Sequence, residues 1–379
     1  MLQGGRGECR HETDHEELFR QESYFHYLFG VAEEGYYGAV DVGSGKATLF
    51  VPELPPEYAV WMGRIPSLEE VRARYGVDEA RPLSAMADAL AGSKLYLLRG
   101  FNSDSGNECA PAAFPSIESF ERDERALHPV LSECRVFKTP GELEVLRYVS
   151  RVSSQAHVAA MRACAPGGME YQLESTFLHH SYFHGGCRLP SYTAICAAGP
   201  HAAVLHYGHA GAPNDGELED GALVLCDMGG EYYGYAADIT CTYPVNGKFS
   251  PVQAQVYNGV LQAHQEVIKA IKPGVQWPVM HRLAERTILR ALVEAGFLRG
   301  DVEAMMAAHV GALFMPHGLG HMLGIDTHDV GGYGPGLPPR IQEPGICKLR
   351  TARTLEEGMF VTVEPGCYFN SFLLEPALE

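Results

Sequence analysis

The segment that most constrains the fold covers residues 223–242 and reads LVLCDMGGEYYGYAADITCT. Its two arms are apolar, and each carries one acidic residue, Asp227 on the first arm and Asp238 on the second. The Gly-Gly and aromatic residues between the arms predict a hairpin, which brings the two carboxylates face to face. Because burying two like charges is costly without a cation between them, this hairpin indicates a metal site. One aspartate at a strand end and one in a turn, both in solvent, is an equally open alternative.

The composition excludes several classes of protein. The chain has 379 residues, of which 46% are hydrophobic and 20% charged, as is typical of a globular protein with two domains. A formal net charge of −18 argues against nucleic acid or an anionic membrane as a main partner. The N-terminus lacks the apolar core of a signal peptide, so we expect a cytoplasmic protein with reduced cysteines.

The pattern of elements changes near residue 136, which predicts two domains. Residues 1–135 mix helices and strands, with a hairpin over residues 35–51 and a helix capped by Ser67, and so predict a small α/β domain. Residues 136–379 begin with a long helix that Thr139 caps and Pro140 opens. The expected fold class of the whole chain is α+β.

The second domain repeats one order of elements, helices followed by strands, and this repeat predicts two related halves. We expect helices in the first half at 139–166 and 170–183, and in the second half at 250–272, 278–295 and 302–310. The expected strands are residues 192–198, 203–207, 222–228 and 235–243 in the first half, and a strand ending at Glu364 in the second.

Three histidines in the predicted helix 170–183 and just after it, His179, His180 and His184, include a pair spaced to share one face. Such a pair can bind zinc. No carboxylate or cysteine partner lies nearby in the sequence, which favours an ordinary helix surface.

Further ligand candidates lie in the second half. The segment MPHGLGHMLGIDTHDV, residues 315–330, places His317, His321 and His328 in a Gly-rich, apolar stretch. The segment MFVTVEPGCY, residues 359–368, ends a β-branched run with Glu364, which repeats the setting of Asp227. A set of three carboxylates and one imidazole (Asp227, Asp238, His321 and Glu364) suits Mn²⁺, Fe²⁺, Co²⁺ or Zn²⁺ better than Mg²⁺ or Ca²⁺. Several carboxylates around one histidine are typical of a two-metal centre, which predicts hydrolysis.

Together the motifs LHYGHAG at residue 205, DMGG with DIT in the hairpin, PHGLGH and VEPG at residue 363 carry a resemblance. The chain resembles the pita-bread metallopeptidases (family M24), which include methionine aminopeptidase, aminopeptidase P and creatinase. The segments LRTAR at residue 349 and IDTHDVGGY at residue 325 make it similar to the vertebrate Xaa-Pro dipeptidase branch, prolidase, over essentially its whole length.

This resemblance implies a metalloprotease that hydrolyses dipeptides with a C-terminal proline or hydroxyproline through a water bridged by two metal ions. Manganese is the expected metal, with Co²⁺, Zn²⁺ and Fe²⁺ as alternatives. The partners implied are the dipeptide and a second copy of the chain in a homodimer, and the pathway implied is collagen and proline metabolism. Two other functions stay open: a non-catalytic binding protein with this fold, and an aminopeptidase P-like enzyme acting on longer peptides.

The metal-ligand roles follow from the resemblance position by position. Asp227 would hold one metal and Asp238 would bridge both. His321 and Glu364 would complete the second metal, and Glu364 would also shuttle protons.

The resemblance also implies the residues that bind substrate. His206 would contact the substrate near the scissile bond, and Tyr192 is a further residue expected to bind substrate. His328 and Arg350 would bind the reacting amide and the proline carboxylate, which an arginine fork suits. For His317, substrate contact and support of the metal ligands are equal alternatives.

The chain departs from the family's pattern at its ends. The second bridging glutamate of the family lies on a strand beyond VEPG, and nothing between Glu364 and Glu379 matches it. A leading segment of the first domain is also unmatched. We therefore expect a chain truncated at both ends, without the last strand of the second domain. A missing bridging carboxylate leaves two cations less neutralised, so weak metal binding and little or no activity are expected.

Overall fold

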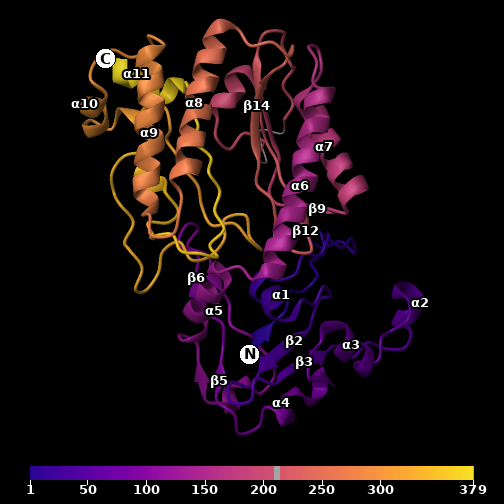
Figure 1. Ribbon diagram of the computed structural model, residues 1–379. Coiled ribbons are helices and arrows are strands. Elements are labelled where there is room, and N and C mark those ends of the chain that lie inside the picture. Colours follow the sequence, from indigo (N-terminus) through magenta and orange to yellow (C-terminus); the bar gives the residue numbers. More distant parts are fainter. Residues whose placement is uncertain (209–213, 379) are drawn as a thin grey trace. The chain divides into compact units, whose positions relative to one another are not determined.

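The computed structural model describes residues 1–208 and 214–378 (Figure 1). The chain forms two compact units, Met1–Arg135 and Val136–Glu379, each with its own apolar core. None of the helices in these residues is both long and apolar enough to cross a membrane.

The first unit is built on a four-stranded sheet with the strand order β1-β2-β3-β4. The predicted hairpin forms from β2 (Tyr37–Val40) and β3 (Ala47–Val51), which pair antiparallel. Helix α3 (Leu68–Tyr75) begins with the predicted capping box of Ser67 and Glu70, which satisfies backbone N–H groups at the helix start. The other elements are β1 (Leu2–Gln3), α1 (Ser23–Phe29), α2 (Tyr58–Met62), β4 (Glu79–Pro82), α4 (Met86–Ala89), β5 (Leu95–Tyr96), β6 (Gly100–Phe101), β7 (Glu108–Cys109), β8 (Arg122–Asp123) and α5 (Leu127–Val136).

The first half of the second unit packs two helices on a small antiparallel sheet. Helix α6 (Pro140–Ala163) starts at the predicted capping box, in which Thr139 and Glu142 bond each other's backbone N–H. It packs beside α7 (Glu170–Gly185), as Figure 1 shows. The sheet has the order β10-β11-β14, formed by Ile195–Ala198, Leu223–Asp227 and Thr240–Pro244. A second sheet joins β13 (Tyr235–Ala236), β12 (Gly230–Tyr232) and β9 (Leu189–Pro190).

The second half repeats the helix pair. Helix α8 (Pro251–Ala270) starts where predicted, is capped by Ser250, and runs beside α9 (Trp277–Glu294) (Figure 1). The buried faces of both helices enclose a second apolar core around the fully buried Trp277. Two shorter helices complete this half, α10 (Val302–Ala307) and α11 (Ser371–Leu378).

Two of the predicted strands are wrong. Ala203 ends the 3₁₀ helix η3 (Gly199–Ala203), and residues 205–208 form a turn, in which the Tyr207 N–H donates to the carbonyl of Val204 over 3.1 Å. Between residues 245 and 378 the structure has no strand, and the segment leading to Glu364 makes only isolated bridges, at Met359 and Val361. The helix pairs of the two halves therefore match, whereas their strands do not.

Candidate metal centre

The first half supplies two aspartates from one antiparallel ladder. In the β11–β14 register Asp227 lies opposite Thr240, and the Met228 N–H donates to the carbonyl of Ile239 over 3.1 Å. Asp238 lies just before β14, so the ladder carries both carboxylates to the same end of the sheet. The hydroxyl of Tyr192 donates to Asp227 and its oxygen lies 3.1 Å from Oδ1 of Asp238. The predicted hairpin therefore forms and brings its two acidic residues together.

The second half supplies a histidine and a glutamate from two segments that pair only briefly. The Thr362 N–H donates to the His321 carbonyl over 2.9 Å, and the Glu364 N–H donates to the Leu319 carbonyl over 2.8 Å. Along this stretch side chains alternate, as in a strand. Val361 and Val363 pack against the apolar core, so Thr362 and Glu364 face the other way.

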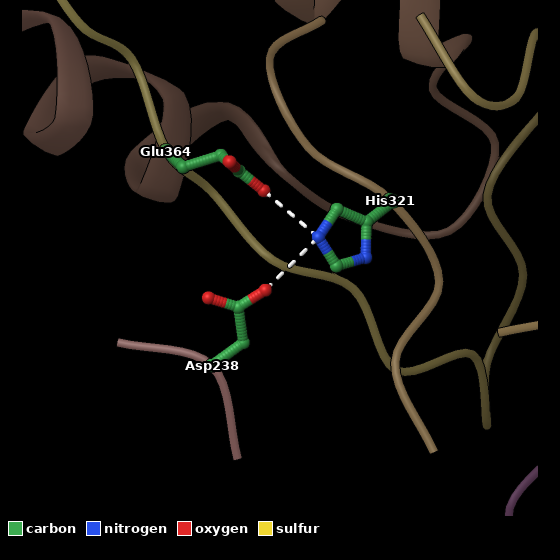
Figure 2. A group of neighbouring side chains, drawn as sticks. All are labelled: Asp238, His321 and Glu364. Carbon is green, nitrogen blue, oxygen red and sulfur yellow. Dashed lines mark hydrogen bonds and ion pairs between the residues drawn. The ribbon is translucent and has the colours of Figure 1, made fainter. Parts of the chain in front are cut away.

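The two halves meet at three side chains. Ligand atoms of Asp238, His321 and Glu364 all lie within 4.8 Å of one another. Figure 2 shows one nitrogen of the imidazole facing both carboxylates, with Nε2 of His321 3.1 Å from Asp238 Oδ2 and 3.1 Å from Glu364 Oε1. On the other side of the ring Nδ1 donates to the Met322 carbonyl over 2.8 Å, which leaves Nε2 as the ligand nitrogen when the ring is neutral.

The electrostatics of the cluster favour binding of a cation. Burial, followed by repulsion from Asp238, raises the pKa of Asp227 to about 7. Burial alone would lower the pKa of His321, but hydrogen bonds to Asp238 and Glu364 outweigh it and raise that pKa to about 10. The carboxylates therefore stabilise a positive charge at this position, as they would stabilise a bound cation. The donor set, three carboxylates and one imidazole, fits a divalent metal.

Sequence reasoning missed two residues at this centre. The hydroxyl of Thr362 accepts a hydrogen bond from the backbone N–H of His321 over 2.9 Å and donates to Glu364 Oε1 over 2.7 Å. It therefore helps to place both ligands. It lies two residues before Glu364, and the alternation of a strand was a signal that could have found it. Tyr368 is the second: its ring lies 5.4 Å from that of His317, and burial beside Glu364 raises the pKa of its hydroxyl.

The remaining predicted residues surround this cluster to different degrees. The ring of His328 meets that of His321 edge-on with centroids 4.6 Å apart, and its neighbour Thr327 donates to the Ser191 carbonyl over 3.0 Å. His317 donates from Nδ1 to the Gly318 carbonyl over 2.8 Å, and its buried Nε2 has no hydrogen-bond partner among the described residues. This acceptor nitrogen without a partner is compatible with both roles predicted for His317, substrate contact and support of the metal ligands.

His206 and Arg350 lie on segments outside the ladder. His206 is exposed in the turn at 205–208, next to the five residues that the structure does not describe. Arg350 is half-buried and follows Leu349, whose Cα would lie 2.7 Å from a Cβ placed on Gly318. The segment of Arg350 therefore runs beside that of His317, and the roles of His206 and Arg350 in binding substrate stay predictions.

The histidines of α7 lie apart from this centre in the sequence and form no comparable cluster. The rings of His180 and His184 are 4.5 Å apart, and no group of three potential ligands in the described residues includes them. His179 and His184 are exposed on the surface of the helix.

Known families match both units. Residues 144–374 match Metallopeptidase family M24, and residues 1–95 match the Aminopeptidase P, N-terminal domain. The chain is 54% identical to the Xaa-Pro dipeptidase of Homo sapiens over 381 aligned residues, which cover 100% of this chain and 77% of that protein. It is 37% identical to the Probable Xaa-Pro aminopeptidase of Verticillium alfalfae, covering 100% of this chain and 80% of that protein.

Solved structures of other proteins share this fold. The aminopeptidase PepP of Pseudomonas aeruginosa superposes with a TM-score of 0.82 at 34% identity, covering 98% of this chain and 82% of that one. Proline aminopeptidase P II from Yersinia pestis gives a TM-score of 0.79 at 33% identity, covering 98% of this chain and 84% of that one.

Proposed function

Because this chain belongs to metallopeptidase family M24, we propose that it is a manganese-dependent dipeptidase that hydrolyses dipeptides with a C-terminal proline or hydroxyproline. The observation that carries the proposal is the imidazole of His321 with one nitrogen facing two carboxylates, one from each half of the second unit. The 54% identity to Xaa-Pro dipeptidase over the full chain supports the choice of substrate.

Metallopeptidases of this family use divalent metal ions, and the residues that would hold them here are Asp227, Asp238, His321 and Glu364. A site rich in oxygen ligands with one imidazole supports Mn²⁺, with Co²⁺, Zn²⁺ and Fe²⁺ as competitors. When bound, the metal supplies Lewis-acid activation of the amide carbonyl and of the attacking water.

The chain's own residues bind, orient and move protons. Glu364 would take a proton from the attacking water and deliver it to the leaving proline nitrogen, and Thr362 holds its carboxylate in place through a 2.7 Å hydrogen bond. The hydroxyl of Tyr192 keeps the two aspartates at a fixed separation. His328, which packs on His321, would hold the substrate amide, and Arg350 would hold the proline carboxylate.

Hydrolysis of alanyl-proline with added Mn²⁺ tests this proposal. We expect cleavage that depends on added metal and is lost in the Asp238→Asn variant, with prolyl-alanine as the uncleaved control. Metal-dependent cleavage of prolyl-alanine at the same rate would contradict it. The same assay over a range of Mn²⁺ concentrations measures how tightly the chain binds the metal.

An aminopeptidase acting on longer peptides is the second candidate, because relatives named Xaa-Pro aminopeptidase and aminopeptidase P match this chain. The tripeptide alanyl-prolyl-alanine separates the two functions. A dipeptidase should prefer alanyl-proline, whose carboxylate Arg350 would bind, whereas faster cleavage of the tripeptide would favour the aminopeptidase.

The proposal includes a homodimer in the cytoplasm. Three consecutive residues of α2 support the dimer, since Val60, Trp61 and Met62 are 78%, 83% and 61% exposed, and an apolar surface of this kind is typical of a binding face. All ten cysteines are free thiols, which supports a reducing compartment. Light scattering of the chain and of the Trp61→Ser variant tests the dimer, and cell fractionation tests the location.

A further inference from the structure

Glu170, the first residue of α7, is a buried acid that lies outside the metal centre. Its side chain is 0% exposed, and its carboxylate accepts four hydrogen bonds. Oε1 accepts from the Ala198 N–H over 2.7 Å and from Nδ1 of His201 over 3.0 Å. Oε2 accepts from the Tyr207 hydroxyl over 2.7 Å and from the Gly216 N–H over 2.9 Å. A buried carboxylate is costly unless donors surround it, and here both oxygens are satisfied twice.

Three of the four donors lie within residues 198–208, and they fix this segment on both sides of His206. Ala198 ends β10, and Tyr207 directly follows His206. The ring of His201 stacks on that of Tyr207 with centroids 4.4 Å apart, so the two side chains bind Glu170 as one unit. The backbone of Glu170 also donates to the Gly216 carbonyl over 2.9 Å, which fixes the point where the chain leaves this segment.

The same segment reaches the second half of the unit. The side-chain amide of Asn370 donates to the Ala203 carbonyl over 2.9 Å, and Asn370 lies six residues after Glu364. Residues 198–208 are therefore fixed by Glu170 on both sides of His206, and Ala203 contacts the chain that follows the predicted proton shuttle. Through these hydrogen bonds a change at Glu170 would be transmitted to the chain that follows Glu364.

We propose that Glu170 is a positioning residue that holds residues 198–208 so that His206 faces the substrate amide. The proposal rests on the proposed function, because the contact between His206 and substrate is part of it. Glu170→Gln is the sharpest test. An amide has one acceptor oxygen, and its NH₂ group would face a backbone N–H that can only donate. The variant therefore keeps the shape of the side chain and loses some of its four hydrogen bonds.

Hydrogen exchange measures the positioning without any need for catalysis. The control is Glu174→Gln, one turn further along α7. Glu174 accepts a hydrogen bond from the Asn214 side chain over 2.8 Å, which a glutamine oxygen still accepts, so the charge change is matched. We expect amides of residues 198–208 to exchange at least about tenfold faster in Glu170→Gln than in this control, with β11 and β14 unchanged. Equal exchange in the two variants would overturn the proposal.

Kinetics then separate positioning from a general loss of stability. If wild type cleaves alanyl-proline, we expect Glu170→Gln to lower kcat/KM by up to about 10²-fold at unchanged metal content, since small misplacements have effects of this size. In a His206→Ala background Glu170→Gln should add no further loss, whereas independent, multiplying losses would overturn the proposal. If wild type cleaves no Xaa-Pro dipeptide, the proposed function fails, and the exchange comparison alone decides whether Glu170 fixes the segment.

Discussion

The two halves of the second unit hold their metal-site residues by different means. Asp227 and Asp238 lie at the end of a regular antiparallel ladder, whose backbone register sets their separation. His321 and Glu364 lie on segments that make only isolated bridges, and they are placed by the hydroxyl of Thr362 and by the Met322 carbonyl. Repeated helix pairs therefore do not require repeated strands, because side-chain hydrogen bonds can place a ligand as well as a ladder does.

The irregular half has two further anchors. Nζ of Lys138 lies 2.8 Å from Oδ2 of Asp329, with both side chains 1% exposed, and Asp329 directly follows His328. A Cβ placed on Gly320 would lie 2.2 Å from the Thr362 carbonyl oxygen, so only glycine allows this close approach. Each anchor can be removed separately, which tests how far the second half depends on them.

The largest effect is expected from Lys138→Met, which leaves Asp329 as a buried charge without its partner lysine. We expect the free energy of unfolding to fall by about 3–5 kcal/mol, as for other broken buried pairs, measured by urea denaturation. The double variant Lys138→Met with Asp329→Leu removes both charges and should recover most of the loss. A single variant as stable as wild type would show that the pair does not anchor the loop of His328.

Gly320→Ala should have the next largest effect. The added methyl meets backbone, which cannot rotate away, so we expect a loss of about 1–3 kcal/mol in urea denaturation. The regular half offers the matching variant Gly229→Ala, where the Cβ would lie 1.8 Å from the Ala237 carbonyl oxygen. Gly334→Ala is the control, since its Cβ would meet only a side chain at 3.9 Å. If the two test variants behave like the control, close backbone approach is not what joins these segments.

Thr362→Val tests the side-chain placement of the ligands. The substitution keeps the shape and removes the hydroxyl that orients Glu364 and accepts from the His321 N–H, so we expect Mn²⁺ affinity to fall by roughly 10–100-fold. Calorimetric metal titration measures it, with unchanged thermal unfolding of the metal-free protein as the check on folding. Wild-type affinity in Thr362→Val would mean that Glu364 is held by other contacts.

The smallest expected effect is the pH dependence of metal binding, which separates Asp227 of the first half from His321 of the second. Because the pKa of Asp227 is raised to about 7 and that of His321 to about 10, metal displaces protons from both below pH 7 and from His321 alone above it. Affinity should therefore rise with pH, by a factor of about ten per displaced proton per pH unit, and more steeply below pH 7.

The stability of the metal-free protein should change with pH in the opposite direction to the metal affinity. Both groups bind protons more tightly in the folded than in the unfolded protein, so its free energy of unfolding falls as pH rises.

For metal binding, calorimetric titrations between pH 6 and 9 in two buffers give the protons released per metal. A pH-independent affinity would contradict the assignment of these two ligands.

Much of this structure was predictable because its determinants are local. Caps such as Thr139 with Glu142 act within one helical turn, so the starts of α3, α6 and α8 follow from neighbouring residues. Elements that depend on distant partners were not predictable in this way. The turn before Gly208 replaces a predicted strand because Tyr207 bonds Glu170, 37 residues away.

The sequence by itself determined the chemistry of the centre, because carboxylates and an imidazole in apolar, glycine-rich surroundings indicate a metal whatever their final geometry. It also determined the family and the helix pairs. Only the tertiary structure decided that Asp238, His321 and Glu364 converge within 4.8 Å, that Thr362 orients two of them, and that Glu170 fixes the segment of His206. Apart from the bond between Thr362 and Glu364, these are contacts between residues far apart in the chain, and they form only when the backbone of both halves has packed.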